Sequence, residues 1–340
     1  VLLRARLQTE RADGQDTSFT VDTLAVELQT QGKFDEAEPL FREALEVRRE
    51  TLGDRHLETL RSINNLGTLM SMKGDLAAAQ PLLREALEVS RETLGNQHLH
   101  TLVSIGNLGT LLQDTGDLAG AEPLLREALE GRRETLGNRH PDTLGSINNL
   151  GELLKSKGDL AAAEPLYREA MAMSRETLGN RHPHTLISIS NLGLLLQAKG
   201  DLAAAERLHR ESLEAKRETL ANRHPSTLTS INNLGTLLYA KGDLAAAGPL
   251  FREALEAQRE TLGNRHPSTL ATISNLGMLL MDKGDLAAAE TLLREALEGV
   301  RETLGNRHPS TLSSMDNLSQ LLEETGDFAA AKQREMDRWT

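Results

Sequence analysis

Apolar side chains follow one another along this chain at helical spacing. Between residues 143 and 178 they form two series, and the first contains Leu144, Ile147, Leu150, Leu153 and Leu154. Steps of three or four residues place these side chains on one face of an α-helix. Gly158 and Asp159 separate the two series, and a glycine commonly ends one helix while an aspartate caps the next. The pattern therefore predicts a helix A over about 143–157 and a helix B over about 160–178.

The helix pair recurs with a period of 42 residues. The period is marked by the glycine that ends helix A, at Gly32, Gly74, Gly116, Gly158, Gly200, Gly242, Gly284 and Gly326. Periods of roughly 20–50 residues are typical of solenoids, in which each unit packs on its neighbours. We therefore expect eight tandem units over residues 14–340, the last one short. Residues 1–13 are expected to form the end of a preceding helix B and a linker.

Each helix A also contains an internal glycine, which costs about 1 kcal/mol relative to alanine. It recurs at Gly67, Gly109, Gly151, Gly193, Gly235 and Gly277. A cost kept at one position in six units indicates a shared steric need, which we expect to be close approach of helix B. The facing small residue is expected to be an alanine of helix B, at Ala79, Ala121, Ala163, Ala205, Ala247 and Ala289.

Composition narrows the range of functions. The chain has 38 basic and 50 acidic residues, a net charge of −12 and no basic run, so we expect no nucleic-acid partner. It has no Cys, which excludes disulfides, thiol catalysis and Cys-ligated zinc. No apolar run is long enough for a membrane helix, so no membrane insertion is expected. Aromatic residues make up only 2%, which suits many small helix contacts better than one thick core.

The residues that carry chemistry give no catalytic or metal site. One histidine per unit recurs ahead of helix A, at His56, His98, His140, His182, His224, His266 and His308. These histidines lie one unit apart, whereas a metal ion needs several ligands around it, so we expect them to cap the loop. Phosphate loops and the hydrolase and metalloprotease motifs do not occur. We therefore expect no catalytic residues, no cofactor, no metal and no enzymatic activity.

The unit resembles the tetratricopeptide repeat (TPR). The resemblance is carried by L-G-x-x-L in helix A, G-D-L at the turn, and A-x-x-x-L/F/Y followed by A-L in helix B. The 42-residue period and the loop G-N-R-H-P are similar to the repeat of kinesin light chains and their relatives, over nearly the whole chain. The resemblance implies an all-α fold, an α-α superhelix built as a right-handed TPR solenoid of antiparallel helix pairs. We expect a cytoplasmic protein, and a targeting segment ahead of Val1 is an open alternative.

The resemblance also implies a binding groove. In this family helix A lines the concave groove, and an asparagine of helix A binds the backbone of a partner peptide. The matching residues, nine positions before the turn glycine, are Asn65, Asn107, Asn149, Asn191, Asn233, Asn275 and Asn317. An amide both donates and accepts hydrogen bonds, so it can bind a peptide backbone whatever the side chains. We expect contact at Asn107, Asn149, Asn191, Asn233 and Asn275. The alternative is that each asparagine bonds to the next unit and only stabilises the stacking.

Positions that vary between units lie on the same helical face as this asparagine, four residues before it and three and six residues after it. In units five to seven the variable positions carry apolar residues, at Ile187, Leu194, Tyr239, Met278 and Met281. A solvated face also varies freely, but contiguous exposed apolar residues usually mark a binding site. We therefore expect an apolar to neutral groove across units five to seven.

Unit five departs furthest from the common pattern. Arg207 stands in place of a proline, Ser212 in place of an alanine and Ala221 in place of a glycine. His209 stands where the other units have Phe, Leu or Tyr at a helix-packing position. We expect these changes to loosen the packing at unit five and to have no catalytic meaning.

Three functions remain open at this point. The first is an adaptor or scaffold that binds proteins or extended peptide segments in the groove. The second is a structural component of a multi-subunit complex, which would use the convex face and the ends of the solenoid. The third is the sensor segment of a larger signalling protein. This repeat class serves all three functions, so the fold alone does not choose between them.

Overall fold

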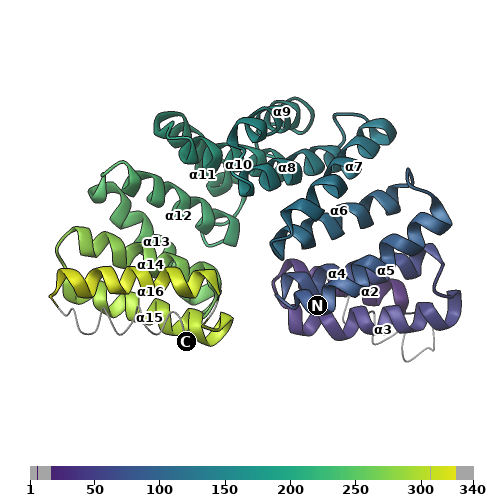
Figure 1. The fold of residues 1–340 in the computed structure, drawn as a ribbon, viewed down its shortest axis with the longest axis horizontal. Coiled ribbons are helices and arrows are strands. Elements are labelled where there is room, and N and C mark those ends of the chain that lie inside the picture. Colours follow the sequence, from purple (N-terminus) through teal and green to yellow (C-terminus); the bar gives the residue numbers. More distant parts are fainter. Residues whose placement is uncertain (1–5, 7–16, 307, 327–340) are drawn as a thin grey trace. The chain divides into compact units, whose positions relative to one another are not determined.

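The described part of the chain forms fifteen α-helices and no strand (Figure 1). The computed structural model describes residue 6, residues 17–306 and residues 308–326. The predicted segment 1–13 lies outside these residues apart from Arg6, and so does the end of unit eight beyond Gly326. The all-α fold predicted from the apolar pattern is confirmed.

Each unit contributes one helix A and one helix B. The A helices are α2 (Ser18–Thr30), α4 (Leu57–Met72), α6 (Leu99–Asp114), α8 (Pro141–Ser156), α10 (Pro183–Ala198), α12 (Pro225–Ala240), α14 (Pro267–Asp282) and α16 (Pro309–Glu324). The B helices are α3 (Phe34–Leu52), α5 (Leu76–Leu94), α7 (Leu118–Leu136), α9 (Leu160–Leu178), α11 (Leu202–Thr219), α13 (Leu244–Thr261) and α15 (Leu286–Leu304). The predicted pair over 143–178 is found as α8 and α9. Helix α8 begins at Pro141, where a missing N–H has no cost.

The helix ends are set by the local residues that the pattern predicted. Gly158 takes a φ of +81°, which is the left-handed region that glycine enters without strain. The side chain of Asp159 then accepts a hydrogen bond from the backbone N–H of Ala162 at 3.0 Å. At the start of helix A, Nδ1 of His140 accepts from the backbone N–H of Asp142 at 3.2 Å. The same histidine bond begins α4, α6, α10, α12, α14 and α16, which confirms the expected capping role.

The glycine within helix A makes room for helix B, but the predicted partner is wrong. A Cβ at Gly67 would lie 2.7 Å from Leu83 Cδ2, and a Cβ at Gly151 would lie 2.8 Å from Tyr167 Cε1. The residue that faces the glycine is therefore the large side chain of helix B, and not the alanine one helical turn before it. The glycine is needed because this large side chain crosses directly over the backbone of helix A.

Two compact parts divide the chain, residues 1–177 with units one to four and residues 178–340 with units five to eight. Within each part, helix A packs on helix B of its own unit, and helix B packs on helix A of the next. Successive A helices also touch directly, as α4 does α6 and α12 does α14. Successive B helices are joined by ion pairs between long side chains, such as Arg91–Glu127 at 2.7 Å and Arg217–Glu253 at 2.6 Å. Within each part the A helices therefore lie closer together than the B helices.

The core is the predicted apolar series. In α8, for example, Leu144, Ile147, Leu150 and Leu153 are all buried. Among the described helices, none is both long and apolar enough to cross a lipid bilayer.

Candidate functional site

The predicted binding residues lie on the A helices, on a surface that we call the helix A face. This face consists of the asparagine of each helix A together with the residues four before and three after it. Asn107 and Asn149 lie in the first part, on α6 and α8. Asn191, Asn233 and Asn275 lie in the second part, on α10, α12 and α14. All five asparagines are half-buried or exposed.

Three of the asparagines use their amide nitrogen to bond to the preceding unit. Nδ2 of Asn107 donates to Asn64 Oδ1 at 3.4 Å, and Nδ2 of Asn317 donates to Ser274 Oγ at 3.0 Å. Nδ2 of Asn275 donates to Asn232 Oδ1 at 3.3 Å. These bonds are of the kind that the stacking alternative requires. They leave the amide oxygens of all three side chains without a donor among the described residues, so each can still accept from a peptide N–H.

Asn149 and Asn233 differ from these three. Neither side chain makes a hydrogen bond with any described residue, although Asn149 is exposed and Asn233 is half-buried. A structural role in stacking therefore does not account for these two amides. Asn191 has a partner of its own within the chain.

The apolar residues predicted for this face are not all exposed. Ile187 is 48% exposed, and Leu194 and Met278 are half-buried. Tyr239 is half-buried, and its hydroxyl donates to Asp282 Oδ2 at 2.7 Å. Burial and this hydrogen bond raise the pKa of Tyr239 to about 12.

Met281 is 2% exposed, so the expectation that it lies on the accessible face is wrong. Six residues turn a helix by about 600°, which carries a side chain about 120° away from the asparagine. In α14 that direction points into the packing between helices. Tyr239, at the same position of α12, stays half-exposed because its longer side chain reaches Asp282.

A pocket of about 440 Å³ opens on the helix A face between units seven and eight. Its lining includes Asn275 and Asn317 of the predicted column, together with Ser274 and Ser314. Val300 and Leu304 of α15 supply apolar surface. The pocket therefore combines amide oxygens, hydroxyls and apolar side chains, a mixture typical of peptide sites.

A second pocket on this face, of about 330 Å³, lies between units one and two and is charged. It is lined by Phe19, Asp22, Arg61 and Asn65, among others. Nη2 of Arg61 lies 3.2 Å from Asp22 Oδ2, and Arg48 of α3 pairs with the same oxygen from beneath. The acid between the two arginines is almost fully buried.

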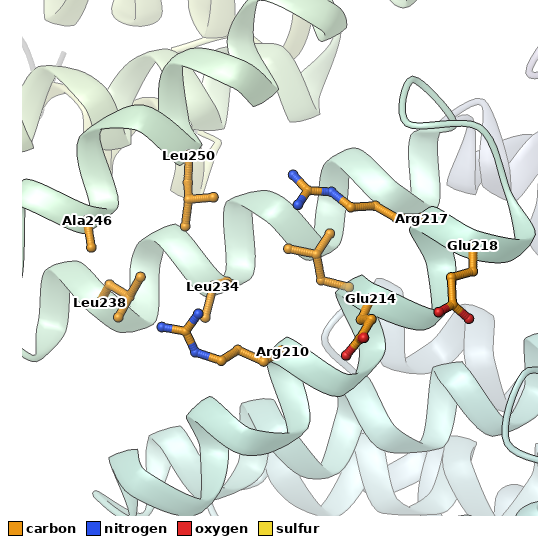
Figure 2. A pocket seen from close by; sticks show the side chains of 9 residues that line it. Arg210, Glu214, Arg217, Glu218, Leu234, Leu238, Ala246 and Leu250 are labelled. Atoms are coloured by element: carbon orange, nitrogen blue, oxygen red, sulfur yellow. The ribbon is translucent and has the colours of Figure 1, made fainter.

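A different groove, of about 500 Å³, is lined by residues of α11, α12 and α13 in units five and six (Figure 2). Leu234, Leu238 and Leu250 give it an apolar lining, and Arg210 and Glu214 stand at its edge (Figure 2). The same combination of a leucine pair with Arg and Glu of helix B recurs in smaller grooves at units two and three and at units seven and eight. This repeated surface lies between helix B of one unit and helix A of the next, and its lining includes none of the asparagines of the column.

One column of residues on helix B was not predicted to be buried. It recurs once per unit, at Arg48, Ser90, Arg132, Ser174, Lys216, Gln258 and Val300. All are buried except Arg132, which is half-buried. Arg48, Arg132 and Lys216 each donate to a serine hydroxyl of the following helix A. Charged residues on a helix usually lie on a solvated face. The overlooked signal is that the same position also accepts Ser, Gln and Val, which a solvated charged position does not require.

Lys216 and His209 are the ionisable residues of this region in unit five. Lys216 is 7% exposed, and its Nζ donates to Ser230 Oγ at 2.8 Å and to Ser190 Oγ at 3.3 Å. Burial lowers the pKa of Lys216 to about 8. His209 is 2% exposed, and burial together with Lys216 lowers the pKa of His209 to about 4. Its Nε2 has no hydrogen-bond partner among the described residues.

No metal centre is found in the part of the chain that the structure describes, where no three His, Asp or Glu residues gather around one point. His98 with His100 and His182 with His184 form two stacked pairs, with ring centroids 5.7 and 5.5 Å apart. In each pair, Nδ1 of the first histidine is occupied by the capping bond to the backbone of the second.

Comparison with known proteins agrees with this geometry. A family model described as tetratricopeptide repeat matches residues 18–92, 72–134, 97–176, 142–218 and 268–336, and a second of the same description matches residues 227–268. No curated protein sequence matches the chain. Among solved structures, the chain is similar to a Podosopora anserina protein assigned as a kinesin light chain with nearly identical TPR-like repeats. That similarity has 28% identity and a TM-score of 0.51, and it covers 61% of this chain and 98% of the other.

A further similar structure is BtubC (BKLC) from P. vanneervenii, with 24% identity and a TM-score of 0.54 over 69% of this chain and 92% of the other. At this identity the likeness concerns the fold alone. Family matches that extend over most of the sequence, together with paired antiparallel helices at a 42-residue period, settle the family. The chain is a TPR solenoid, similar to kinesin light chain-like proteins, and it belongs to the tetratricopeptide-repeat family.

Proposed function

We propose that this chain is a cytoplasmic adaptor or scaffold that binds an extended peptide segment of a partner protein on its helix A face. TPR proteins are in general protein-interaction modules, and the finer assignment of a face and a ligand is the proposal. The observation that carries it is the pocket between units seven and eight, which brings Asn275 and Asn317 together with hydroxyl and apolar side chains.

The hydrogen bonds of the asparagines support this proposal. Asn275 and Asn317 are held in place by bonds from their amide nitrogens to the preceding unit. Fixed in this way, the amide oxygens can accept from a peptide backbone without first losing rotamer freedom. Asn149 and Asn233 have both amide groups available to a ligand.

A second candidate is a structural scaffold that binds its partner in the grooves between helix B and the next helix A. The groove of Figure 2 favours it, because the half-buried Leu250 and the buried Leu234 and Leu238 line it between charged residues of helix B. The two candidates use different surfaces, so substitutions can separate them.

Selection of random peptides displayed on phage tests the proposal. The immobilised chain is compared with the Asn191→Ala/Asn233→Ala double variant and with a Glu214→Lys/Ala246→Glu variant of the Figure 2 groove, each checked for helicity by circular dichroism. We expect the asparagine variant to lose peptides that the groove variant retains. The reverse pattern would assign binding to helix B and contradict the proposal.

A further inference from the structure

Lys216 is a buried cation that lacks an acid. None of the described carboxylates lies within ion-pair distance of its Nζ. The groups around it are the hydroxyls of Ser190 on α10 and Ser230 on α12, with Ser212 of α11 bonded to Ser190 at 2.9 Å. The other ionisable side chain that acts on this region is His209 of α11. A buried ammonium is stable only when it is paired or well hydrogen-bonded, and here two hydroxyls bond to it without neutralising its charge.

The same position in unit one shows how that requirement is met. Four units earlier, Arg48 stands in place of Lys216 and Ser62 in place of Ser230. Arg48 bonds to the hydroxyl of Ser62, as Lys216 does to that of Ser230. In addition it pairs with the carboxylate of Asp22, which stands in place of Ser190. The serine in unit five is shorter than aspartate and brings no charge, so the place of the carboxylate is left to another group.

In two other pairs of units, the corresponding place opens on the helix A face. In unit one, Asp22 itself lines the pocket of about 330 Å³ on that face. In units seven and eight, the residues that correspond to Ser190, Lys216 and Ser230 are Ser274, Val300 and Ser314, and all three line the pocket of about 440 Å³. Lys216 therefore lies beneath the same part of the helix A face, next to Asn191 and Asn233 in sequence register.

No second cation stands between Lys216 and the helix A face at the position that Arg61 occupies in unit two. In unit two, Arg61 covers Asp22 from the helix A face at 3.2 Å. Thr229 stands at the same position of unit six, and it is exposed. Threonine is shorter and uncharged, and its hydroxyl already donates to the backbone oxygen of Pro225 at 3.0 Å, so it does not compete for an incoming acid.

We propose that Lys216 binds a carboxylate side chain of the partner peptide, an Asp or Glu that occupies the place held by Asp22 in unit one. This inference rests on the proposed function, because the acid must arrive on a segment bound to the helix A face. The ammonium supplies a charge-assisted hydrogen bond, and the hydroxyl of Ser230, which accepts from Lys216 Nζ at 2.8 Å, can direct its own proton to the same carboxylate. Two units further on, Val300 makes the corresponding pocket neutral, so no acid is expected at that position of the peptide.

Sequencing of selected peptides tests this inference. Random peptides are displayed with both ends joined to carrier protein, so that only side chains can supply a carboxylate. They are selected on the full chain, on Lys216→Met, on Ser190→Asp and on Lys283→Met, which removes one exposed charge elsewhere. For the unchanged chain and the Lys283→Met control we expect enrichment of Asp or Glu at one position. Replacement of that residue by Gln or Asn should weaken binding about tenfold or more, the effect of one hydrogen bond to a charged group.

In Lys216→Met the preference for an acid should fall to about twofold or less, since no buried charge remains for it to pair with. In Ser190→Asp the added carboxylate should exclude the peptide acid, as Asp22 does in unit one. Circular dichroism shows whether Lys216→Met folds. If it does not fold, Ser190→Asp still tests the inference.

Each other result counts against the inference. Peptides that bind through Asn233 without enriched acids, or with a preference that persists in Lys216→Met, would overturn it and leave the proposed function intact. A second library carries peptides with a free C-terminus. If peptides are enriched only from that library, the carboxylate comes from the C-terminus and not from a side chain, and the inference is wrong. If no peptide binds any form of the chain, the proposed function falls and this inference falls with it.

Discussion

Two interfaces between neighbouring units, built on the same backbone positions, treat a buried cation in opposite ways. Between units one and two, Arg48 pairs with Asp22, and Arg61 contacts the same carboxylate from the helix A face. Between units five and six, Lys216 bonds to Ser190 and Ser230 and meets no acid. The first interface is complete within the chain. For the second, we propose that a bound ligand supplies the negative charge, which would give this position a role beyond stacking.

The largest effect is expected when the first interface loses its acid. Asp22→Ser gives that interface the side chain of Ser190 and leaves the buried Arg48 with only the more distant, partly exposed carboxylate of Glu58, at 3.5 Å. Removal of one partner of a buried ion pair costs about 3–5 kcal/mol in the free energy of unfolding. Chemical denaturation followed by circular dichroism measures the change. A loss below about 1 kcal/mol, the value of an exposed pair, would show that Arg48 is not held by Asp22.

Removal of the unpaired cation should have the opposite sign. Lys216 has a pKa of about 8 in the folded chain against 10.5 for an ordinary lysine, so the unfolded chain binds its proton more tightly. Below pH 8 the full penalty applies, and it declines as the pH rises from about 8 to about 10.5. Lys216→Met should therefore stabilise the fold at pH 7 by about 3 kcal/mol, which is the pKa difference expressed as free energy. Denaturation of both proteins at pH 7 and pH 10.5 checks this. A stability difference that does not change with pH would contradict it.

His209 offers a smaller test at acid pH. Its pKa is about 4 in the fold against 6.5 normally, so the unfolded chain takes up the proton first and stability is lost as the pH falls from about 6.5 to about 4. His209→Phe places the residue of Phe251 opposite the glycine of helix A, where unit six already accommodates it. Relative to this variant, the unchanged chain should lose about 2 kcal/mol between pH 6.5 and pH 5. The free energy of unfolding of both proteins is measured from pH 7 to pH 4. The two curves should diverge below pH 6.5, and a constant difference between them would contradict the buried neutral state of His209.

The smallest effect is expected when the second interface is given the acid of the first. Ser190→Asp should pair with Lys216, raise the pKa of Lys216 towards its ordinary value and stabilise the fold by about 1.5 kcal/mol, the contribution of a hydrogen bond to a charged group. Lysine side-chain NMR follows the pKa and denaturation follows the stability. In the double variant Ser190→Asp/Lys216→Met the gain should disappear, since the new carboxylate then has no cation. A gain that survives in the double variant would show that the aspartate acts elsewhere.

Most of the fold could be predicted from the sequence, because its determinants are local. Gly158, Asp159 and His140 act on the backbone within three residues of themselves, and the apolar series of α8 follows from helical spacing alone. The partner of Gly151 was predicted wrongly because it depends on how deep each side chain of helix B reaches, and spacing does not give depth.

The candidate site was less accessible to prediction. Ile187 lies exposed as expected. Met281 is buried, because it lies about 120° around the axis of α14 from Asn275. The burial of Lys216 was missed altogether, because a lysine on helix B carries no local mark of whether its head group reaches solvent or the next unit. The 42-residue period places Lys216, Arg48 and Val300 at one position, but only the structure shows that this position is buried.

The binding of an acidic side chain by Lys216 is tested most directly by two dissociation constants, obtained by calorimetric titration at pH 7. One titration uses a peptide selected on the chain that contains the enriched Asp or Glu, and the other uses its twin with Asn or Gln at that residue. We expect the acidic peptide to bind at least about tenfold more tightly than its amide twin, and the two dissociation constants to become equal in Lys216→Met. Equal constants on the unchanged chain would contradict it.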